Sequence, residues 1–321
     1  MRRFVAMAAL FAVGMSAAAH AQDYPTRPVR VLTPFAPGGG TEVVGRLLCD
    51  QLTQAFGQSF YLESKPGGGG NIATEILVRS PPDGHTLLIN SVVALGTNPA
   101  LYPHLSFDPV NDLVPVTMLV KFTNVLEVSQ KLGVKTLPEF VAYAKANPGK
   151  LNHGSPGIAT MPHLAAELLK KRLGFTSVHV PYRGTSPMAQ GVLQGEVQWA
   201  FDSPTTALTM VKNGAATVLA VAGSQRDPRF PGVATLLEQG VPDTAWDTGH
   251  MLMAPAKTPK PVLARLAAEI AKSFRTDTAV QRLTAVGVDP NPTTPEEAAR
   301  IVDESRARWS AVVIANNIKV E

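Results

Sequence analysis

Short apolar runs alternate with amphipathic stretches along most of the chain. Residues 29–33 (VRVLT) form an apolar run that Pro34 ends, and residues 42–56 place five apolar side chains on one helical face. The same pattern predicts further strands at 60–62, 86–89, 151–155, 178–180, 197–201 and 217–221, and helices at 71–78, 162–172, 188–193 and 205–213. Strands that alternate with helices at this spacing predict an α/β protein with a mostly parallel sheet.

Two capping boxes mark further helix starts. Residues 136–139 (TLPE) and 294–297 (TPEE) each place Thr three positions before Glu, with Pro near the first helical position. The second box opens the last of two or three C-terminal helices, which are expected at about 259–274, 278–286 and 295–315. Residues 123–245, which include the first box, repeat the strand–helix alternation and could form a domain of their own.

The N-terminus has the layout of a secretory signal. Arg2 and Arg3 precede an apolar run over residues 4–15, and small residues then lead to Ala19-His20-Ala21. A membrane anchor is the alternative, but a span needs roughly 20 apolar residues and this run is shorter. We therefore expect a signal peptide over residues 1–21 and an exported mature protein that begins at Gln22.

Charge and cysteine content narrow the function classes. Without Arg2 and Arg3 the chain keeps 27 basic and 25 acidic residues, a formal charge of +2, and the basic residues do not cluster. This balance argues against nucleic acid as a partner. The single Cys49 excludes an internal disulfide and a cysteine-based metal cluster, and the histidines lack metal-ligand spacing. No metal and no cofactor are expected.

Glycine-rich loops follow three of the predicted strands. Residues 34–41 (PFAPGGGT) join a strand to a helix, where free backbone N–H groups and the helix dipole favour an anion such as a carboxylate. The loop matches neither a P-loop nor G-x-G-x-x-G, and a plain tight turn explains it equally well. Residues 154–160 (GSPGIAT) make a similar turn, whereas residues 65–71 (KPGGGGN) suggest a packing turn. Two such loops facing each other could hold one carboxylate.

Two further residues have competing interpretations. Asp202 ends a predicted strand, where α/β proteins place their ligand crevice, but it could equally cap the helix that follows Pro204. Ser155 with a nearby His could suggest a hydrolase. Ser155 lacks the G-x-S-x-G context because His153 takes the first position, so a non-catalytic role is favoured.

A series of short motifs, in order along the chain, is similar to one known family. The motifs are residues 24–29 (YPTRPV), 37–39 (PGG), 56–58 (FGQ), 65–69 (KPGGG), 82–87 (PDGHTL), 98–99 (NP), 181–184 (PYRG), 238–240 (EQG) and 254–255 (AP). In their order and spacing over about 290 residues, the chain resembles the Bug-type receptors of tripartite tricarboxylate transporters.

The resemblance implies a class II periplasmic-binding-protein fold with two α/β lobes, a hinge and a ligand cleft. Lobe 1 would comprise residues 22–122 and 246–321, and lobe 2 residues 123–245. The family's ligand-binding positions map onto Phe35, Gly38, Gly39, Thr41, Ser155, Gly157, Thr160 and Asp202, with Asp202 at the far end of the ligand. Two departures stand out: Glu42 replaces the usual Asp, and Ala159-Thr160 replaces Gly-Ser. The Glu42 side chain could alter the cleft or only complement the helix dipole.

The resemblance therefore implies a monomeric receptor without catalytic activity. It would capture a small mono- or dicarboxylate and deliver it to the membrane subunits of a transporter. A sensor subunit that signals to a membrane kinase would need the same cleft and remains an alternative. A hydrolase built on Ser155 is the enzyme alternative, and it predicts turnover of an ester or amide.

Overall fold

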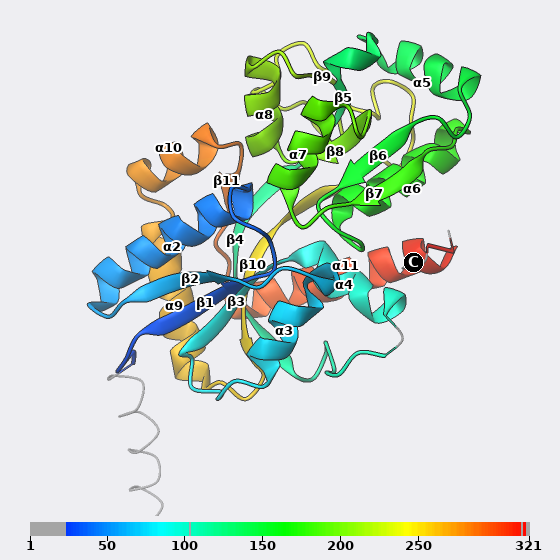
Figure 1. The fold of residues 1–321 in the computed structure, drawn as a ribbon. Coiled ribbons are helices and arrows are strands. Elements are labelled where there is room, and N and C mark those ends of the chain that lie inside the picture. The colour runs from blue at the N-terminus through cyan, green and yellow to red at the C-terminus, as the bar shows by residue number, and fades with distance from the viewer. Residues whose placement is uncertain (1–23, 103, 316, 319–321) are drawn as a thin grey trace, which may run out of the picture.

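The protein folds into two lobes joined by long strands (Figure 1). The computed structural model describes residues 24–102, 104–315 and 317–318, so the predicted signal peptide lies outside the described residues. In Figure 1 the second lobe, coloured green to yellow, sits above the first, and the two-lobed α/β expectation is confirmed.

Lobe 1 is built on a six-stranded sheet with the order β11-β4-β10-β3-β1-β2. Its strands are β1 (Val29–Thr33), β2 (Phe60–Ser64), β3 (Thr86–Ser91), β4 (Leu113–Thr123), β10 (Asp247–Pro255) and β11 (Asp289–Pro290). Its helices are α2 (Gly40–Phe56), α3 (Asn71–Val78), α4 (Val92–Leu101), α9 (Lys260–Ser273), α10 (Asp277–Ala285) and α11 (Pro295–Ala315), with a 3₁₀ turn, η1 (Gly68–Gly70).

Lobe 2 is built on a five-stranded sheet with the order β7-β6-β8-β5-β9. Its strands are β5 (Val125–Ser129), β6 (Asn152–Ser155), β7 (Val178–Pro181), β8 (Trp199–Asp202) and β9 (Ala216–Val221). Its helices are α5 (Leu137–Ala146), α6 (Met161–Leu173), α7 (Thr185–Gln194) and α8 (Pro204–Lys212), with a 3₁₀ turn, η2 (Gln130–Leu132).

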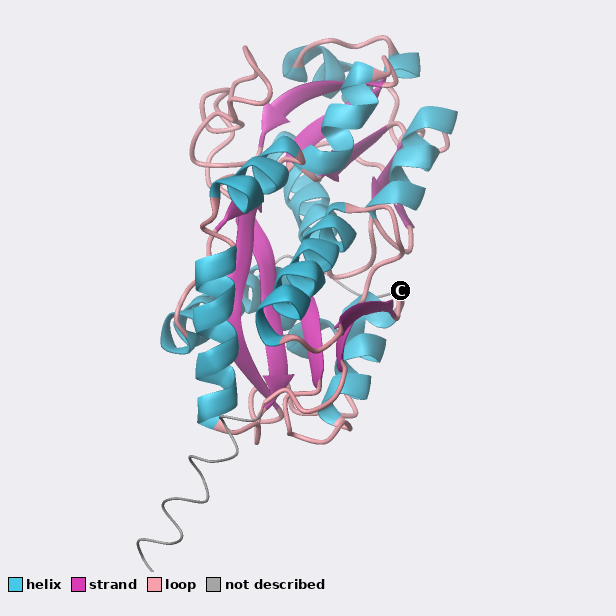
Figure 2. Cartoon of the chain, turned by 90° about the vertical axis from the view of Figure 1, so that its left-hand side faces the viewer, coloured by secondary structure: helices cyan, strands magenta, loops and turns pink. Residues whose placement is uncertain are grey.

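The hinge is the antiparallel pair β4 and β10. Their register runs from Leu113 opposite Pro255 to Thr123 opposite Asp247, and Figure 2 shows these long strands rising toward the second lobe. Asn124 alone separates β4 from β5, the first strand of lobe 2. The lobes are therefore joined by extended backbone, which can absorb a rotation with small changes in φ and ψ.

Amphipathic patterning explains how the helices pack. α2 buries Val44, Leu47, Leu48 and Leu52, one helical face, against the sheet of lobe 1. In lobe 2 the aromatic side chains of Phe140, Phe201 and Trp199 are fully buried. Trp309 of α11 joins that same core cluster, so the C-terminal helix contacts both lobes.

Both sheets are mixed, which corrects the expectation of a mostly parallel sheet. β1 pairs in parallel with β2 and β3, and β6 with β7 and β8, but β10, β4, β11, β5 and β9 pair antiparallel. Pro115 within β4 and the register shifts along β10 obscure the strand pattern there. The helix starts were predicted correctly: Thr136 and Thr294 accept hydrogen bonds from the N–H groups of Glu139 and Glu297.

Membrane-spanning helices are not found in the described part of the chain. No helix there combines the length and the apolar character needed to cross a bilayer.

Candidate functional site

A narrow cavity, hereafter the cleft, lies between the two lobes. It encloses about 50 Å³ and is lined by Phe35, Gly39, Gly40, Thr41, Ser91, Phe122, Asn124, Pro156, Thr160, Met161, Pro162, Thr185, Ser203, Thr205, Thr248, His250 and Val288. These residues come from both lobes and from the hinge strand β10. None of them, within the described chain, is Lys, Arg, Asp or Glu.

Five helices begin at the cleft. Gly39, Ser91, Thr160 and Ser203 are the N-cap residues of α2, α4, α6 and α8, and Thr185 is the first residue of α7; all five line the cleft. A helix N-terminus carries a partial positive charge and unpaired N–H groups. The cleft is therefore suited to an anion even though no lining side chain is cationic.

Glu42 fixes the first glycine-rich loop, residues 34–41, through a hydrogen bond to its backbone. The Gly38 N–H donates to the Glu42 carboxylate, which also accepts from Arg46 Nε at 2.7 Å. The Gly38 N–H, with help from Arg46, holds the pKa of Glu42 below its usual range. Glu42 does not line the cleft, so of the two roles expected for it the structure favours the one at the start of α2.

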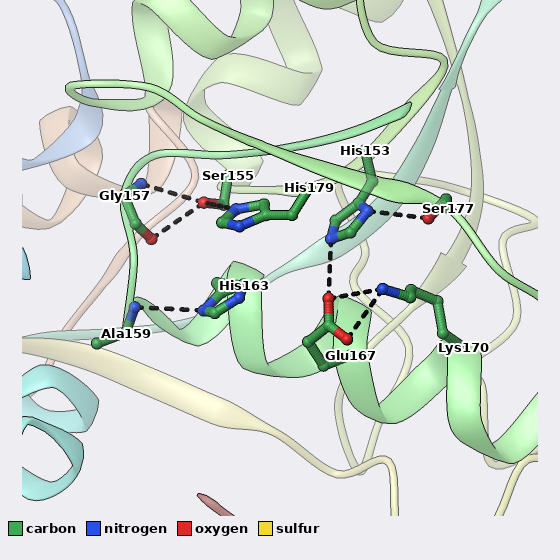
Figure 3. A network of polar contacts seen from close by, with 9 residues as sticks. All are labelled: His153, Ser155, Gly157, Ala159, His163, Glu167, Lys170, Ser177 and His179. Carbon is green, nitrogen blue, oxygen red and sulfur yellow. Dashed lines mark hydrogen bonds and ion pairs between the residues drawn. The ribbon is translucent and has the colours of Figure 1, made fainter. Parts of the chain in front are cut away.

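The second loop, residues 154–160, is tied together by its own hydroxyl groups. Ser155 Oγ lies 2.7 Å from Nε2 of His179 and 3.0 Å from the Gly157 carbonyl oxygen (Figure 3). Thr160 Oγ1 donates to the same carbonyl at 2.6 Å. Thr160 lines the cleft, whereas Ser155 is fully buried and lies behind it. Ser155 and Gly157 therefore shape the loop rather than border the cleft.

A stack of histidine rings supports this loop from behind. The rings of His163 and His179 lie 4.1 Å apart, and the rings of His153 and His179 lie 5.0 Å apart. The Ala159 N–H donates to Nδ1 of His163 at 3.3 Å (Figure 3). Burial lowers the pKa of His163 to about 4 and that of His179 to about 3, so both rings are neutral near pH 7. Ala159, at φ 66°, is fully buried and does not line the cleft.

The contact between Ser155 and His179 does not extend into a catalytic triad. Glu167 lies 3.3 Å from Nε2 of His153 and 2.7 Å from Nζ of Lys170. Among the described residues no carboxylate forms an ion pair with His179, and the Ser155 side chain is closed to solvent. The arrangement lacks the orienting acid that activates a serine nucleophile.

Asp202 lies behind the cleft. Its side chain is fully buried and accepts from the Ser203 N–H at 2.7 Å, and Ser203 rather than Asp202 lines the cleft. The neighbouring strand carries Glu127, which is also fully buried. Burial raises the pKa of Glu127 to about 8, and burial together with the charge of Glu127 raises the pKa of Asp202.

Glu127 should make the protein less stable as the pH rises from about 5 to 8. Its folded pKa of about 8 lies above the ordinary 4.5, so the unfolded chain releases this proton first and stability falls as the pH rises between these values. We expect the stability of Glu127→Gln relative to the wild type to increase by about 3 kcal/mol between pH 5 and pH 8. Urea unfolding at both pH values tests this, with the exposed Glu304→Gln as control; a parallel pH profile for Glu127→Gln and wild type would contradict it.

The two lobes approach each other closely at a backbone hydrogen bond and at glycines of the first lobe. The Ala36 N–H donates across the cleft to the Arg183 carbonyl oxygen at 3.1 Å. A Cβ on Gly40 would lie 2.9 Å from Thr205 Oγ1, and one on Gly69 would lie 2.9 Å from the Ile158 carbonyl oxygen. The loop 65–71 was expected to pack against the first glycine-rich loop; it lies against Pro34 of that loop and also approaches Ile158 of the second lobe. The lobes can therefore come this close only because Gly40 and Gly69 have no side chain.

Four of the eight predicted ligand-binding residues line the cleft. These are Phe35, Gly39, Thr41 and Thr160; Gly38 lies beside the cleft against Ser186, and Ser155, Gly157 and Asp202 lie behind it. The sequence interpretation missed Ser91, Asn124, Thr185, Ser203, Thr205, Thr248 and His250. Ser203-Pro204 could have been identified as a helix start, because Ser at the N-cap and Pro at the first position are typical of one.

Metal binding has no support in the described residues, where no group of three or more His, Cys, Asp or Glu could hold an ion. A known protein is similar to this chain over its whole length. BugT from Bordetella pertussis strain Tohama I is 30% identical over 324 residues, covering 100% of this chain and 99% of BugT.

Two solved structures match the fold closely. Rpa4515 of R. palustris with adipate is 30% identical with a TM-score of 0.89, covering 92% of this chain and 99% of that one. MatC of Rhodopseudomonas palustris with bound malate is 32% identical with a TM-score of 0.86, covering 90% and 100%. Residues 44–318 match the family profile TctC, described as the tripartite tricarboxylate transporter family receptor. The chain belongs to this receptor family and is a Bug-type member of it.

Proposed function

We propose that this protein is a periplasmic receptor that captures a small carboxylate and delivers it to the membrane subunits of a tripartite tricarboxylate transporter. The observation that carries the proposal is the convergence of five helix N-termini on a cleft without charged side chains. Relatives of similar length have been solved with adipate and malate, which supports a carboxylate as the ligand class.

The binding mode follows from the cleft lining. The carboxylate would accept from backbone N–H groups at the starts of α2 and α6 and from the Thr41 hydroxyl, while Thr160, whose hydroxyl donates to the Gly157 carbonyl, would position the start of α6. Phe35 would cover the ligand. The two lobes, residues 22–122 with 246–321 and residues 123–245, would close by rotation about β4 and β10, and ligand would shift the population toward the closed form. The protein would act as a monomer without cofactor or catalysis.

A thermal-shift screen of residues 22–321 against a panel of carboxylates tests the proposal. An acid present at 100 times its dissociation constant should stabilise the protein by about 2.7 kcal/mol, which is a visible shift. A selective, saturable shift with one class of acid is the expected result. If no carboxylate raises the melting temperature while a neutral compound does, the carboxylate proposal is wrong.

The Thr41 hydroxyl should contribute measurably to the affinity. Thr41→Val removes the hydroxyl at nearly constant volume and is expected to weaken binding by about 1 kcal/mol, roughly fivefold. Titration calorimetry with the acid chosen by the screen measures this change. Thr284→Val on α10, a threonine that does not line the cleft, is the matched control. Equal affinities in the Thr41 variant and the control would exclude Thr41 from the ligand contacts.

A further inference from the structure

Three side chains that line the cleft carry a polar atom without a partner. In the described chain, no hydrogen bond reaches Thr205 Oγ1, Thr248 Oγ1 or Nδ1 of His250, and all three atoms are buried. Thr248 and His250 are only 8% and 6% exposed. An unsatisfied buried polar atom costs about 1–3 kcal/mol, so three of them beside one cavity indicate a partner that arrives with the ligand.

Thr248 and His250 share one face of the hinge strand. They are two residues apart on β10, and side chains at such positions point to the same side of a sheet. His250 reaches the first helix start, because its Nε2 lies 3.0 Å from Oγ1 of Thr41. The unpartnered atoms therefore belong to the side-chain network that also includes Thr41.

The protonation of His250 determines what the network can accept. Burial lowers the pKa of His250 to about 4, so near pH 7 its ring is neutral and carries a single N–H. Thr41 likewise has one hydroxyl proton. If Thr41 donates that proton to the ligand carboxylate, its oxygen must accept from Nε2–H of His250. Nδ1 is then a bare acceptor that faces no donor in the described chain.

We propose that the ligand is a hydroxycarboxylate whose hydroxyl donates to Nδ1 of His250 and contacts Thr248 and Thr205. This inference rests on the proposed function, since it assumes a carboxylate at Thr41. The hydroxyl supplies the missing donor, and its own lone pairs can accept from the threonine hydroxyls. His250 thus couples recognition of the carboxylate to recognition of the hydroxyl.

Other ligand groups satisfy the network less well. A ketone oxygen only accepts, so a 2-oxo acid leaves Nδ1 unpaired and places two acceptors together. A methylene group leaves all three polar atoms without partners. Sites built to hydrogen-bond a hydroxyl discriminate strongly against analogues that lack it, because the buried polar groups then stay unpaired.

Matched pairs of acids test the inference. Titration calorimetry of residues 22–321 compares lactate with pyruvate, malate with oxaloacetate, 2-hydroxyglutarate with 2-oxoglutarate, and 3-hydroxybutyrate with acetoacetate. In the pair whose chain length fits, the hydroxy acid is expected to bind at least about tenfold more tightly than the oxo acid. His250→Gln keeps a polar group toward Thr41 but removes Nδ1, and it should reduce this preference to less than about threefold.

Two further measurements keep the test independent of that variant. Thr248→Val should weaken the hydroxy acid while leaving the oxo acid nearly unchanged. Thr258→Val is its control, since Thr258 is also a buried threonine with an unpartnered hydroxyl but lies outside the cleft. Nitrogen NMR of the wild type with the hydroxy acid bound should show His250 protonated at Nε2.

The outcomes separate this inference from the proposed function. Oxo acids that bind as well as hydroxy acids, or a His250 ring protonated at Nδ1, would overturn the hydroxycarboxylate inference and leave the receptor proposal standing. If none of these acids and no other carboxylate binds, the receptor proposal fails and this inference fails with it.

Discussion

A Gly39→Val variant is expected to bind its carboxylate at least about 100-fold more weakly than the wild type, a loss of about 2.7 kcal/mol. Gly39 has extended backbone angles, φ −93° and ψ 173°, which a valine adopts without strain. A Cβ at this position would instead collide with Oγ1 of Thr185 on the opposite lobe. The substitution should therefore act on closure of the lobes rather than on the folding of either lobe.

The measurement must separate closure from folding. Titration calorimetry gives the affinity, urea unfolding without ligand gives the stability, and small-angle scattering with ligand reports whether the lobes close. The double variant Gly39→Val, Thr185→Gly removes the obstructing side chain and should recover much of the affinity. A Gly39→Val protein that closes normally, or one destabilised as much as its affinity falls, would show that this contact does not limit closure.

Local patterns predicted most of the helices, because these have their own periodicity or capping signals, but α4 (Val92–Leu101) was missed. α3 and α11 have the boundaries expected from periodicity and capping, and α2 begins within two residues of its predicted start. The strands that define the hinge were missed. β4 contains Pro115 and β10 contains Gly249, and both residues are unfavourable within a strand. The two strands also lie more than a hundred residues apart along the chain, so no local pattern predicts that they pair.

Only half of the predicted ligand-binding residues line the cleft, because the others were inferred from neighbours in the sequence rather than in space. Loop 34–41 could be recognised because glycines, a strand and a helix start are neighbours in the sequence. Thr205 lies on α8 and Thr248 and His250 lie on β10, more than 40 residues later in the sequence, so only the folded structure brings them to one cavity. Asp202 illustrates the opposite error: it does end a strand, but its side chain turns back to the Ser203 N–H and lies behind the cleft.

The protein is also expected to lose about 3 kcal/mol of stability as the pH falls from 6.5 to about 4, because of His163 alone. The folded pKa of His163 lies below the ordinary 6.5, so the unfolded chain binds the proton first. This contribution is complete above pH 6.5 and is lost progressively down to about pH 4. Around the ring, Glu167 favours protonation, whereas His153 and Lys170 oppose it together with burial, which is the dominant cause.

Protonation of His163 should also disturb ligand binding. Nδ1 of His163 accepts the Ala159 N–H at 3.3 Å, and a protonated ring can no longer accept it. The added charge would also face the ring of His179 at 4.1 Å, which has a low pKa of its own. The loop 154–160 carries Thr160 into the cleft, so affinity should fall over the same pH range in which stability falls.

Melting temperature measured from pH 4 to pH 8 tests this argument. His163→Gln does not titrate, so its stability should depend less steeply on pH than that of the wild type, with the difference growing toward pH 4. The exposed His104→Gln is the matched control and should follow the wild type. Burial favours a higher pKa for Glu167, but its contacts with His153 and Lys170 lower that pKa to about 2. Protonation of Glu167 should therefore still reduce the stability of all variants at the most acidic pH values. A His163→Gln profile parallel to the wild type would mean that His163 does not cause the loss of stability toward pH 4.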